Sequence, residues 1–314
     1  MNTRTTLRAG VLVGSALALL ATLPGTAALA STGAPAAISA GRLVLEPTGN
    51  GYRGTLPVTI TNRSRAADYY SILVTEPVAG SFDGLAPGGP CFQADPVENR
   101  RVFECSVGGP DLEPGERRSV DIFFEVLTAP RRYAMTAADG RVEVVPGRTQ
   151  QVAAGRDVTT LFRATNGSLR HPRPYVQDTS PNASLTAGAD ALTLTRQADG
   201  TYAGRLPVTV RYAGDAPHDH LAVQATLPAG VEIAGTDPQD SPSFGGFFEV
   251  PGGRMAEGEE RTFAVLFRTS ADTVAGELGA VDFVLSTSYG DGAVADATPA
   301  DNNARVTLNA SDGS

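Results

Sequence analysis

The chain has 314 residues, a formal net charge of −9 and 34 acidic side chains against 25 basic ones, all of them arginine. This acidic balance argues against nucleic acid and anionic lipid as partners, because both would be repelled. Tryptophan is absent and there are 8 tyrosines, which argues against a sugar-binding platform made of broad aromatic faces.

Residues 1–30 have the pattern of a secretory signal peptide. Arg4 and Arg8 precede a run of apolar and small residues at 9–23, and Ala28-Leu29-Ala30 supplies a cleavage site before Ser31. A retained membrane anchor, the alternative, would need a longer unbroken apolar span. No later segment approaches that length, so we expect a secreted chain that does not insert into the membrane after cleavage.

The rest of the chain predicts an all-β fold. Apolar residues alternate with polar ones, best seen at Val120, Ile122 and Phe124, and turn residues separate the short runs. Residues 31–37 form a small-residue leader without a core pattern. Seven strands are expected first, at 41–46, 54–62, 69–75, 101–106, 118–127, 133–137 and 157–164, and seven more at 191–196, 204–212, 221–227, 247–250, 262–269, 281–287 and 304–309.

One motif occurs twice, 150 positions apart. Tyr52-Arg-Gly-Thr-Leu-Pro-Val-Thr59 returns as Tyr202-Ala-Gly-Arg-Leu-Pro-Val-Thr209. The turn at 113–118 likewise matches 256–261, which places Val120, Ile122 and Phe124 on Phe263, Val265 and Phe267. A repeat at a fixed offset indicates one module used twice. The proline of the motif favours a strand edge or a bulge.

These patterns predict two tandem immunoglobulin-like β-sandwiches of about seven strands each, at 31–168 and 184–314. Residues 169–183 between them are rich in proline. Two alternatives remain open for this linker. It is either a stiff, extended spacer or a surface connection packed on one of the sandwiches.

Cys91 and Cys105 are the two cysteines of the chain. In an exported protein they are expected to pair, because the turn-forming residues between them allow the segment to fold back. A redox-active or nucleophilic cysteine would need a C-x-x-C motif or a histidine-rich setting, and neither is present. In the second copy Val250 is expected at the position of Cys105, so the disulfide is an accessory to the fold.

Several segments carry a family resemblance. Val102-Phe-Glu-Cys105 with Leu112-Glu-Pro-Gly-Glu116, Leu227-Pro-Ala-Gly-Val231, and Pro299-Ala-Asp-Asn-Asn-Ala304 together resemble a bacterial conserved-repeat domain of unknown function. They are also similar to cell-adhesion-related bacterial domains of the same sandwich type. The resemblance implies tandem modules of exported or surface proteins, acting as spacers or adhesive units without a catalytic centre.

Two segments are candidates for metal binding. His218 and His220 flank Asp219 and could bind zinc or copper weakly, although a third ligand is lacking and a solvated hairpin turn is the simpler interpretation. Asp291, Asp296 and Asp301, with Asn302 and Asn303, form an oxygen-rich region that could attract calcium. Their spacing fits turn formation better, as does that of Asp237 and Asp240, and no residue is assigned as a metal or cofactor ligand.

No catalytic residue is assigned either. The chain has no Gly-x-Ser-x-Gly, no His-Glu-x-x-His and no phosphate-binding glycine loop. The expected function is therefore that of a non-enzymatic extracellular spacer, adhesion or protein-interaction module, whose partner is a protein or another cell-surface component. A calcium- or metal-dependent binding module is the alternative, and a hydrolase with a dispersed carboxylate pair is a third, weaker hypothesis.

Overall fold

A computed structural model describes residues 33–98, 100–290 and 292–312. The signal-peptide prediction for residues 1–30 lies outside the described residues. Within them the chain is all-β, as predicted, and its one helical element is the short 3-10 helix η1 (Pro299–Asn302). Of the helices in this described part, none has the length and apolar character to cross a membrane.

The N-terminal half, residues 34–168, contains two sheets. The first has eight strands and the order β13-β9-β12-β2-β3-β8-β5, with β1 also paired to β3; the second has five strands and the order β11-β10-β4-β7-β6. The strands are β1 (Ala36–Ala40), β2 (Leu43–Thr48), β3 (Gly51–Asn62), β4 (Tyr70–Thr75), β5 (Phe82–Ala86), β6 (Cys91–Val97), β7 (Arg100–Ser106), β8 (Arg117–Val126), β9 (Met135–Thr136), β10 (Gly140–Pro146), β11 (Ala154–Val158), β12 (Thr160–Phe162) and, from the linker, β13 (Arg173–Pro174).

The C-terminal half, residues 183–312, forms one sheet of eleven strands. Its order is β18-β21-β16-β15-β24-β22-β17-β20-β19, with β14 also paired to β16 and β23 to β22. The strands are β14 (Ala183–Ala187), β15 (Ala191–Arg196), β16 (Tyr202–Tyr212), β17 (His220–Thr226), β18 (Val231–Asp237), β19 (Ser243–Phe244), β20 (Phe247–Glu249), β21 (Glu259–Thr269), β22 (Gly276–Tyr289), β23 (Gly292–Val294) and β24 (Asn303–Ser311).

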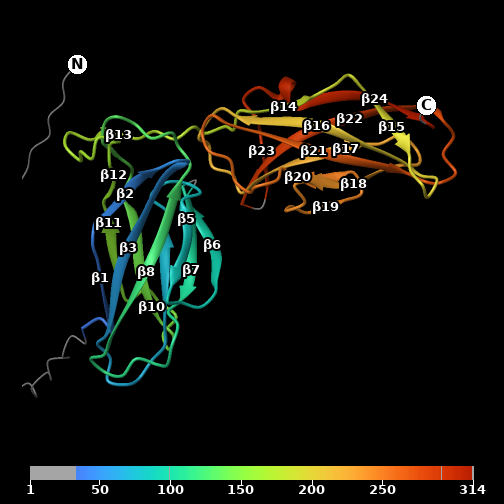
Figure 1. The fold of residues 1–314 in the computed structure, drawn as a ribbon. Helices are drawn as coiled ribbons and strands as arrows, with labels where there is room; N and C mark the ends of the chain where they lie inside the picture. Colours follow the sequence, from blue (N-terminus) through green and yellow to red (C-terminus); the bar gives the residue numbers. More distant parts are fainter. Residues whose placement is uncertain (1–32, 99, 291, 313–314) are drawn as a thin grey trace, which may run out of the picture. The chain divides into compact units, whose positions relative to one another are not determined.

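Each half has its own hydrophobic core. In the N-terminal half, buried residues of both sheets join one cluster, for example Ile122 on β8 and Val144 on β10, so the two sheets form a β-sandwich (Figure 1). In the C-terminal half the single sheet curls over on itself. Phe267 on β21 and Phe283 on β22 meet in its core with ring centroids 6.4 Å apart.

The sheets differ in number because two strands are interrupted in the N-terminal half. β24 pairs with both β22 and β15, and these pairings join the two layers of the C-terminal half. Its counterpart is broken at Thr159 into β11, which pairs with β10, and β12, which pairs with β2. The counterpart of β22 is likewise divided, into β9 and β10. The detached β9 then accepts β13 as a parallel neighbour.

The register of the two copies confirms the predicted repeat. Val58 faces Val120 and Leu56 faces Ile122 across β3 and β8. Val208 faces Phe263 and Leu206 faces Val265 across β16 and β21.

The matching turns before these strands also agree. Gly115 and Gly258 both have positive φ, 83° and 79°. The Gly115 amide donates to Asn62, and the Gly258 amide donates to Tyr212, the residue at the same position of the other copy. In both copies a glutamate three residues into the turn accepts from the first backbone amide.

The prolines of the motif lie in a local gap of the hydrogen-bond ladder. β3 is a central strand, which corrects the expectation of a strand edge or bulge. However, β1 pairs with β3 only from Val58 onward and β2 only up to Arg53. Pro57 lies between these two partners, where no N–H is needed. In the other copy Pro207 has the same position, between the pairings of β15 and β14.

Most predicted strands are present, but several were missed. β1 occupies part of the expected leader, because Ala36 and Ile38 are buried against β3. β10 was missed although Val142 and Val144 alternate with Arg141 and Glu143, the period-two pattern of a half-buried strand. The expected strand at 133–137 contracts to the two residues of β9. The division into two domains of seven strands stays a prediction.

The linker is packed against the N-terminal half, as the second alternative proposed. The amides of Arg173 and Tyr175 donate to the carbonyls of Ala134 and Thr136. The ring of Tyr175 lies 4.9 Å from that of Phe162. These contacts account for β13, so this part of the linker is not a free spacer.

A glycine of the repeated motif provides a test of the packing. A Cβ at Gly54 would lie 2.5 Å from the carbonyl oxygen of Val44 and 2.9 Å from Leu45 Cδ2. We expect Gly54→Ala to lower the free energy of unfolding by about 1–3 kcal/mol, because the backbone of β2 must shift. Urea denaturation measures this change. Gly41→Ala is the control, since its Cβ would meet nothing within 4 Å; equal effects of the two substitutions would contradict the prediction.

Candidate functional site: a polar joint between the two halves

Glu76 follows β4 directly, and its side chain is completely buried. Its carboxylate accepts hydrogen bonds from the amides of Gly80 and Phe82, at 3.0 and 2.8 Å. It also accepts from the amide and guanidinium of Arg101, with an Nη2–Oε1 distance of 3.1 Å. A buried carboxylate is tolerated only when it is paired and hydrogen-bonded in this way.

Arg101 on β7 connects Glu76 to the C-terminal half. Its Nη1 lies 2.7 Å from Asp219 Oδ1, and its guanidinium lies over the rings of Phe103 and Tyr289, at 5.1 and 4.8 Å from their centroids. Burial alone would lower the pKa of Arg101, but the charge and hydrogen bonds of Glu76 raise it above its ordinary value. Arg101 therefore stays protonated between its two carboxylates.

Tyr289 and Asp219 complete this group, which we call the polar joint: Glu76, Arg101, Asp219 and Tyr289. The Tyr289 hydroxyl donates to Glu76 Oε2 at 3.3 Å. Asp219 Oδ2 accepts from the Gly290 amide at 2.8 Å. Burial, with the nearby negative charge of Glu76, raises the pKa of Tyr289. The hydroxyl is therefore held in its protonated, donating form.

Two further ion pairs connect the same two halves through other elements. Arg254 donates to the carbonyl of Gly80 at 2.6 Å and to Glu125 at 2.8 Å. Glu257 lies 2.8 Å from Arg131 and also accepts from the Thr128 hydroxyl and the Ala129 amide. The two halves are thus joined by several charged groups that are partly shielded from water.

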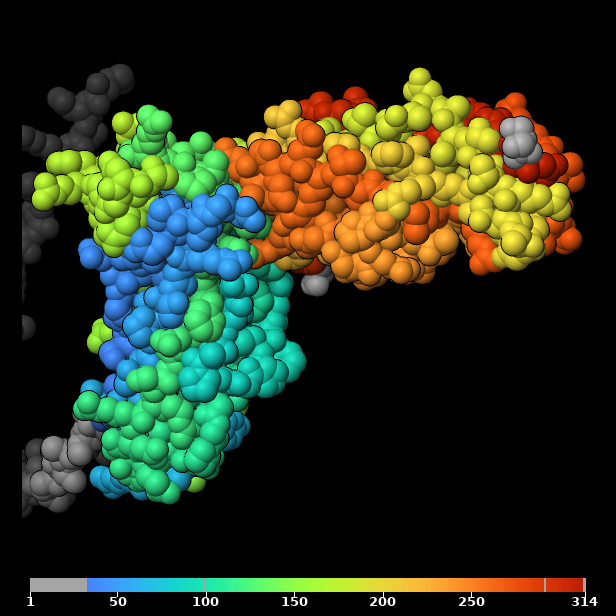
Figure 2. All heavy atoms as spheres, viewed as in Figure 1, coloured from blue at the N-terminus to red at the C-terminus, as the bar shows by residue number. Residues whose placement is uncertain are grey.

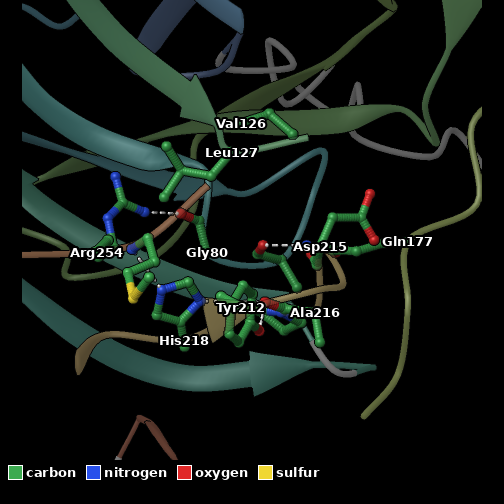
Figure 3. Close-up of a pocket in the computed structure, with 12 residues that line it drawn as sticks. Gly80, Val126, Leu127, Gln177, Tyr212, Asp215, Ala216, His218 and Arg254 are labelled. Carbon is green, nitrogen blue, oxygen red and sulfur yellow. Dashed lines mark hydrogen bonds between the residues drawn. The ribbon is translucent and has the colours of Figure 1, made fainter. Parts of the chain in front are cut away.

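His218 is a buried side chain and not part of a solvated turn, which corrects the sequence-based interpretation. It is 3% exposed, and its ring lies 4.4 Å from that of Tyr212. Nε2 accepts from the amide of Met255 at 3.0 Å, and Nδ1 lies 3.3 Å from the carbonyl of Ala216 (Figure 3). Burial lowers the pKa of His218 to about 4. The imidazole is neutral at pH 7, with both nitrogens engaged.

The structure does not bring His218 and His220 together as ligands. The Nε2 atom of His220 lies 2.9 Å from the Ser288 hydroxyl, and Asp219 between them belongs to the polar joint. Among the residues that the structure describes, no three histidine, cysteine, aspartate or glutamate side chains are grouped as a metal site would require. His171 lies in the linker, exposed.

The oxygen-rich residues of the C-terminal half are used to form turns. Asp296 accepts from the amides of Ala183 and Thr298, one on each oxygen, at 2.9 and 2.7 Å. Asn303 donates to the carbonyl of Pro299 from the end of η1. Asp291 lies outside the described residues. These bonds agree with the turn-forming interpretation, because the side chains bond to the backbone.

The other acidic pair is also engaged locally. Asp237 forms an ion pair with Arg205, and Asp240 accepts from the neighbouring Ser241 hydroxyl at 3.3 Å. Asp301 lies within η1.

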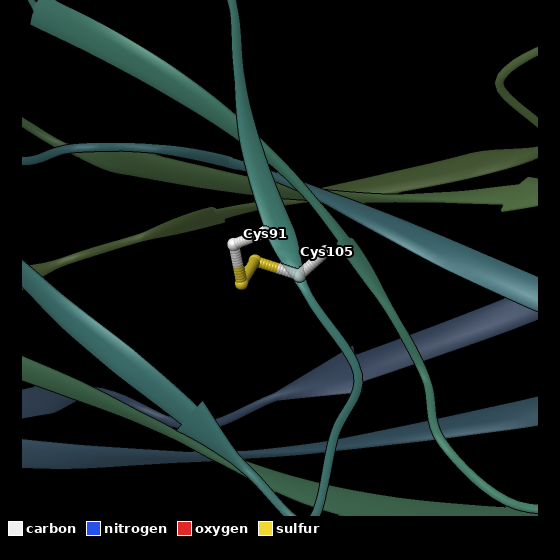
Figure 4. Close-up of a disulfide and its surroundings, with 2 residues drawn as sticks. All are labelled: Cys91 and Cys105. Carbon is white, nitrogen blue, oxygen red and sulfur yellow. A yellow bond between two sulfur atoms is a disulfide. The ribbon is translucent and has the colours of Figure 1, made fainter.

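Cys91 and Cys105 form the predicted disulfide, between directly opposed residues of β6 and β7 (Figure 4). β6 is the outermost strand of its sheet, so the bond attaches an edge strand. The counterpart of Cys105 in the other copy is Phe248, not Val250 as expected. Phe248 faces Val223 as Cys105 faces Ile72, and the Val250 amide donates to Leu221 as Val107 donates to Tyr70.

The titration of His218 has a consequence for stability. Its pKa is lowered in the folded chain, so its stabilising contribution is complete above pH 6.5 and declines as the pH falls toward 4. We expect the wild-type chain to lose about 2–3 kcal/mol from this group between pH 7 and pH 4.5. His218→Gln removes the titration while keeping an acceptor for the Met255 amide. Urea denaturation at both pH values should show a smaller loss in the variant, and equal losses would exclude this role.

The disulfide closes a segment with a sequence separation of 14 residues. We expect Cys91→Ala/Cys105→Ala to lower the free energy of unfolding of the N-terminal half by about 3 kcal/mol, because the unfolded chain gains conformational freedom. Reduced wild-type protein, which keeps both sulfur atoms in place, is the matched control and should lose a similar amount. Unchanged stability after reduction would be evidence against this contribution.

Comparisons with known proteins give no family for the chain. No family model matches it, and no curated protein matches it. One solved structure, a protein of unknown function from Porphyromonas gingivalis W83, covers 88% of this chain and 99% of its own at 12% identity and a TM-score of 0.22. Another, the ASH/PapD-like domain 7 of human CEP192, covers 49% of this chain and 97% of its own at 16% identity and a TM-score of 0.24. At these scores neither likeness bears on function, and the sequence resemblance to bacterial conserved-repeat domains stays a prediction.

Proposed function

We propose that the chain is a secreted, non-enzymatic pair of immunoglobulin-like β-sandwiches that serves as a stiff extracellular spacer or interaction module. The polar joint is the observation that carries this proposal. An arginine whose side chain is 11% exposed is held by one carboxylate from each half. Such a group resists separation, because parting the halves would leave Arg101 and Glu76 with an incomplete set of partners.

The strand order supports the immunoglobulin-like assignment. β1 and β2 pair with β3, β3 with β8 and β8 with β5, while the opposite sheet has the order β11-β10-β4-β7. These are the positions of strands A, B, E and D and of strands G, F and C in an immunoglobulin sandwich. The sandwiches are expected as rigid supports, with binding carried out by their loops or sheet edges.

The candidate metal-binding residues of the sequence analysis make structural contacts. His218 is neutral and buried, Asp219 belongs to the polar joint, and Asp296 fixes two backbone amides. Their roles favour a structural protein over the metal-dependent alternative.

Spin labels provide the test of stiffness. Cysteines placed at the exposed Val152 and Val274 carry one spin label in each half. Double electron–electron resonance spectroscopy measures the distribution of distances between the two labels. We expect a narrow distribution in the wild-type chain. Asp219→Ala/Arg254→Ala/Glu257→Ala should broaden it, because these side chains bridge the halves while the Glu76–Arg101 pair stays intact within one half.

A control variant removes ion pairs inside each half. Asp157→Ala/Arg163→Ala/Arg305→Ala disrupts the pairs with Arg141, Glu46 and Asp282, and we expect it to leave the distribution narrow. A broad distribution already in the wild-type chain would mean a flexible tether and would refute the stiff spacer.

A further inference from the structure

A groove of about 500 Å³ lies on the N-terminal half and is lined by three arginines, Arg63, Arg117 and Arg156. Arg63 follows β3, Arg117 begins β8 and Arg156 lies on β11. All three are exposed. Among the described residues, none of these three guanidinium groups makes a hydrogen bond or an ion pair, whereas most arginines of this half are paired with acids or carbonyls.

The register explains why these side chains converge. Arg117 faces Thr61 of β3, and Thr61 in turn faces Ala37 of β1. Arg117, Thr61 and Ala37 therefore lie in one row across the sheet. Alternation places this row on the outer face, because Ile60 and Val120 point into the core. β1, β3 and β8 lie in blue and green on the side of the molecule that Figure 2 shows.

Arg156 reaches the groove from the other sheet. β11 neighbours β1 at the rim of the sandwich. Arg156 faces the buried Val142 on β10, so its Cβ has the inward direction. A charged side chain at such a position on the outermost strand extends around the rim toward water.

The second copy of the module serves as an internal comparison. Ala213 corresponds to Arg63, because each backbone amide donates to the carbonyl of the residue that precedes the first strand of its copy. The Arg63 amide donates to Pro35, and the Ala213 amide donates to Asn182. Glu260 corresponds to Arg117 through the register of β16 and β21. Phe162 and Ala310 correspond, because they pair with Leu45 and Leu194 at the same position of the two copies. Six residues before each of them lie Arg156 and Ala304, which therefore also correspond. The fold does not require these arginines, because its second copy forms without them.

Charge is also distributed unequally between the copies. Residues 31–168 contain 14 arginines and 15 acids, whereas residues 184–314 contain 7 arginines and 18 acids. An anion is therefore repelled by the C-terminal half but not by the near-neutral N-terminal half. The overall charge of −9 conceals this difference.

We propose that the groove binds an anionic polysaccharide, with Arg63, Arg117 and Arg156 contacting its acidic groups. The planar guanidinium suits carboxylate, sulfate or phosphate oxygens, to which it donates two parallel hydrogen bonds. Small and hydroxyl-bearing residues, among them Ser39 and Thr61, line the rest of the groove. No aromatic side chain lines it, so binding would rest on the acidic groups of the polymer and not on stacking against sugar faces or against the bases of single-stranded nucleic acid.

This proposal adds a partner to the proposed extracellular function and rests on export of the chain. Its test uses the whole mature chain, residues 31–314. The probes are fluorescent polygalacturonate, which carries carboxylates, and dextran sulfate, with neutral dextran and single-stranded DNA for comparison. Fluorescence anisotropy at about 50 and about 200 mM salt gives the affinities and their dependence on screening.

The test variant takes the residues of the second copy, Arg63→Ala/Arg117→Glu/Arg156→Ala. We expect it to weaken binding of at least one acidic polysaccharide roughly tenfold or more, and to reduce the dependence on salt. Arg42→Ala/Arg132→Glu/Arg170→Ala makes the same change of net charge at exposed arginines that do not line the groove. It should weaken binding less than about threefold. Which acidic polymer binds more tightly identifies the acidic group preferred.

Equal losses in the two variants would overturn the proposal, since net charge would then explain the binding. So would equal affinity for neutral dextran or for single-stranded DNA, or no binding of the wild-type chain to either acidic polysaccharide. Because the substituted side chains are exposed, an unchanged melting temperature should confirm that both variants fold. Failure here leaves the stiff spacer intact, because the spin-label distances measure the polar joint and not the groove.

Discussion

The contact on which the arrangement of this chain depends is the burial of Arg101 between Glu76 and Asp219. Glu76 is completely buried and cannot be solvated, so it must be satisfied by the loop at Gly80 and by Arg101. The Arg101 guanidinium has a further amino group, Nη1, which binds Asp219, and its plane lies over the ring of Tyr289. Satisfying one buried charge therefore brings together elements that are 213 positions apart in the sequence, Glu76 and Tyr289.

The linker strengthens the same connection. Tyr175 packs on Phe162 of the N-terminal half, and its hydroxyl donates to Asp215 of the C-terminal half at 2.8 Å. Gln177 donates to the carbonyls of Ala79 and Asp215. β9 is available for this segment only because the counterpart of β22 is interrupted in the N-terminal half. A break in one strand thus serves to attach the chain that leads to the next module.

The sequence was most informative where the cause is local. Alternation of apolar residues located β3, β8, β16 and β21, although β10 was missed despite the same pattern. The repeated motif predicted which positions of the two copies correspond, because a two-residue period leaves one choice of face. Strands that depend on distant partners were predicted poorly: β1 was missed, and the strand expected at 133–137 is reduced to the two residues of β9. The polar joint was not predictable either. Glu76 follows β4, and Arg101 is the second residue of β7. Nothing in the sequence around either residue indicates that the two charges will be buried together.

The burial of His218 was also not predictable from its sequence neighbours. Its sequence neighbours, Pro217 and Asp219, are typical of a turn, and the segment before β17 is an irregular loop. The side chain is nevertheless buried, because Tyr212 and the amide of Met255 provide a partner for each part of the ring. Comparison of the two copies in one chain shows which residues the fold requires, without a prediction of their contacts. Where both copies keep a residue, as at Gly54 and Gly204, the shared fold explains it; where they differ, as at Arg117 and Glu260, the fold does not, and the difference points to what one copy contacts and the other does not.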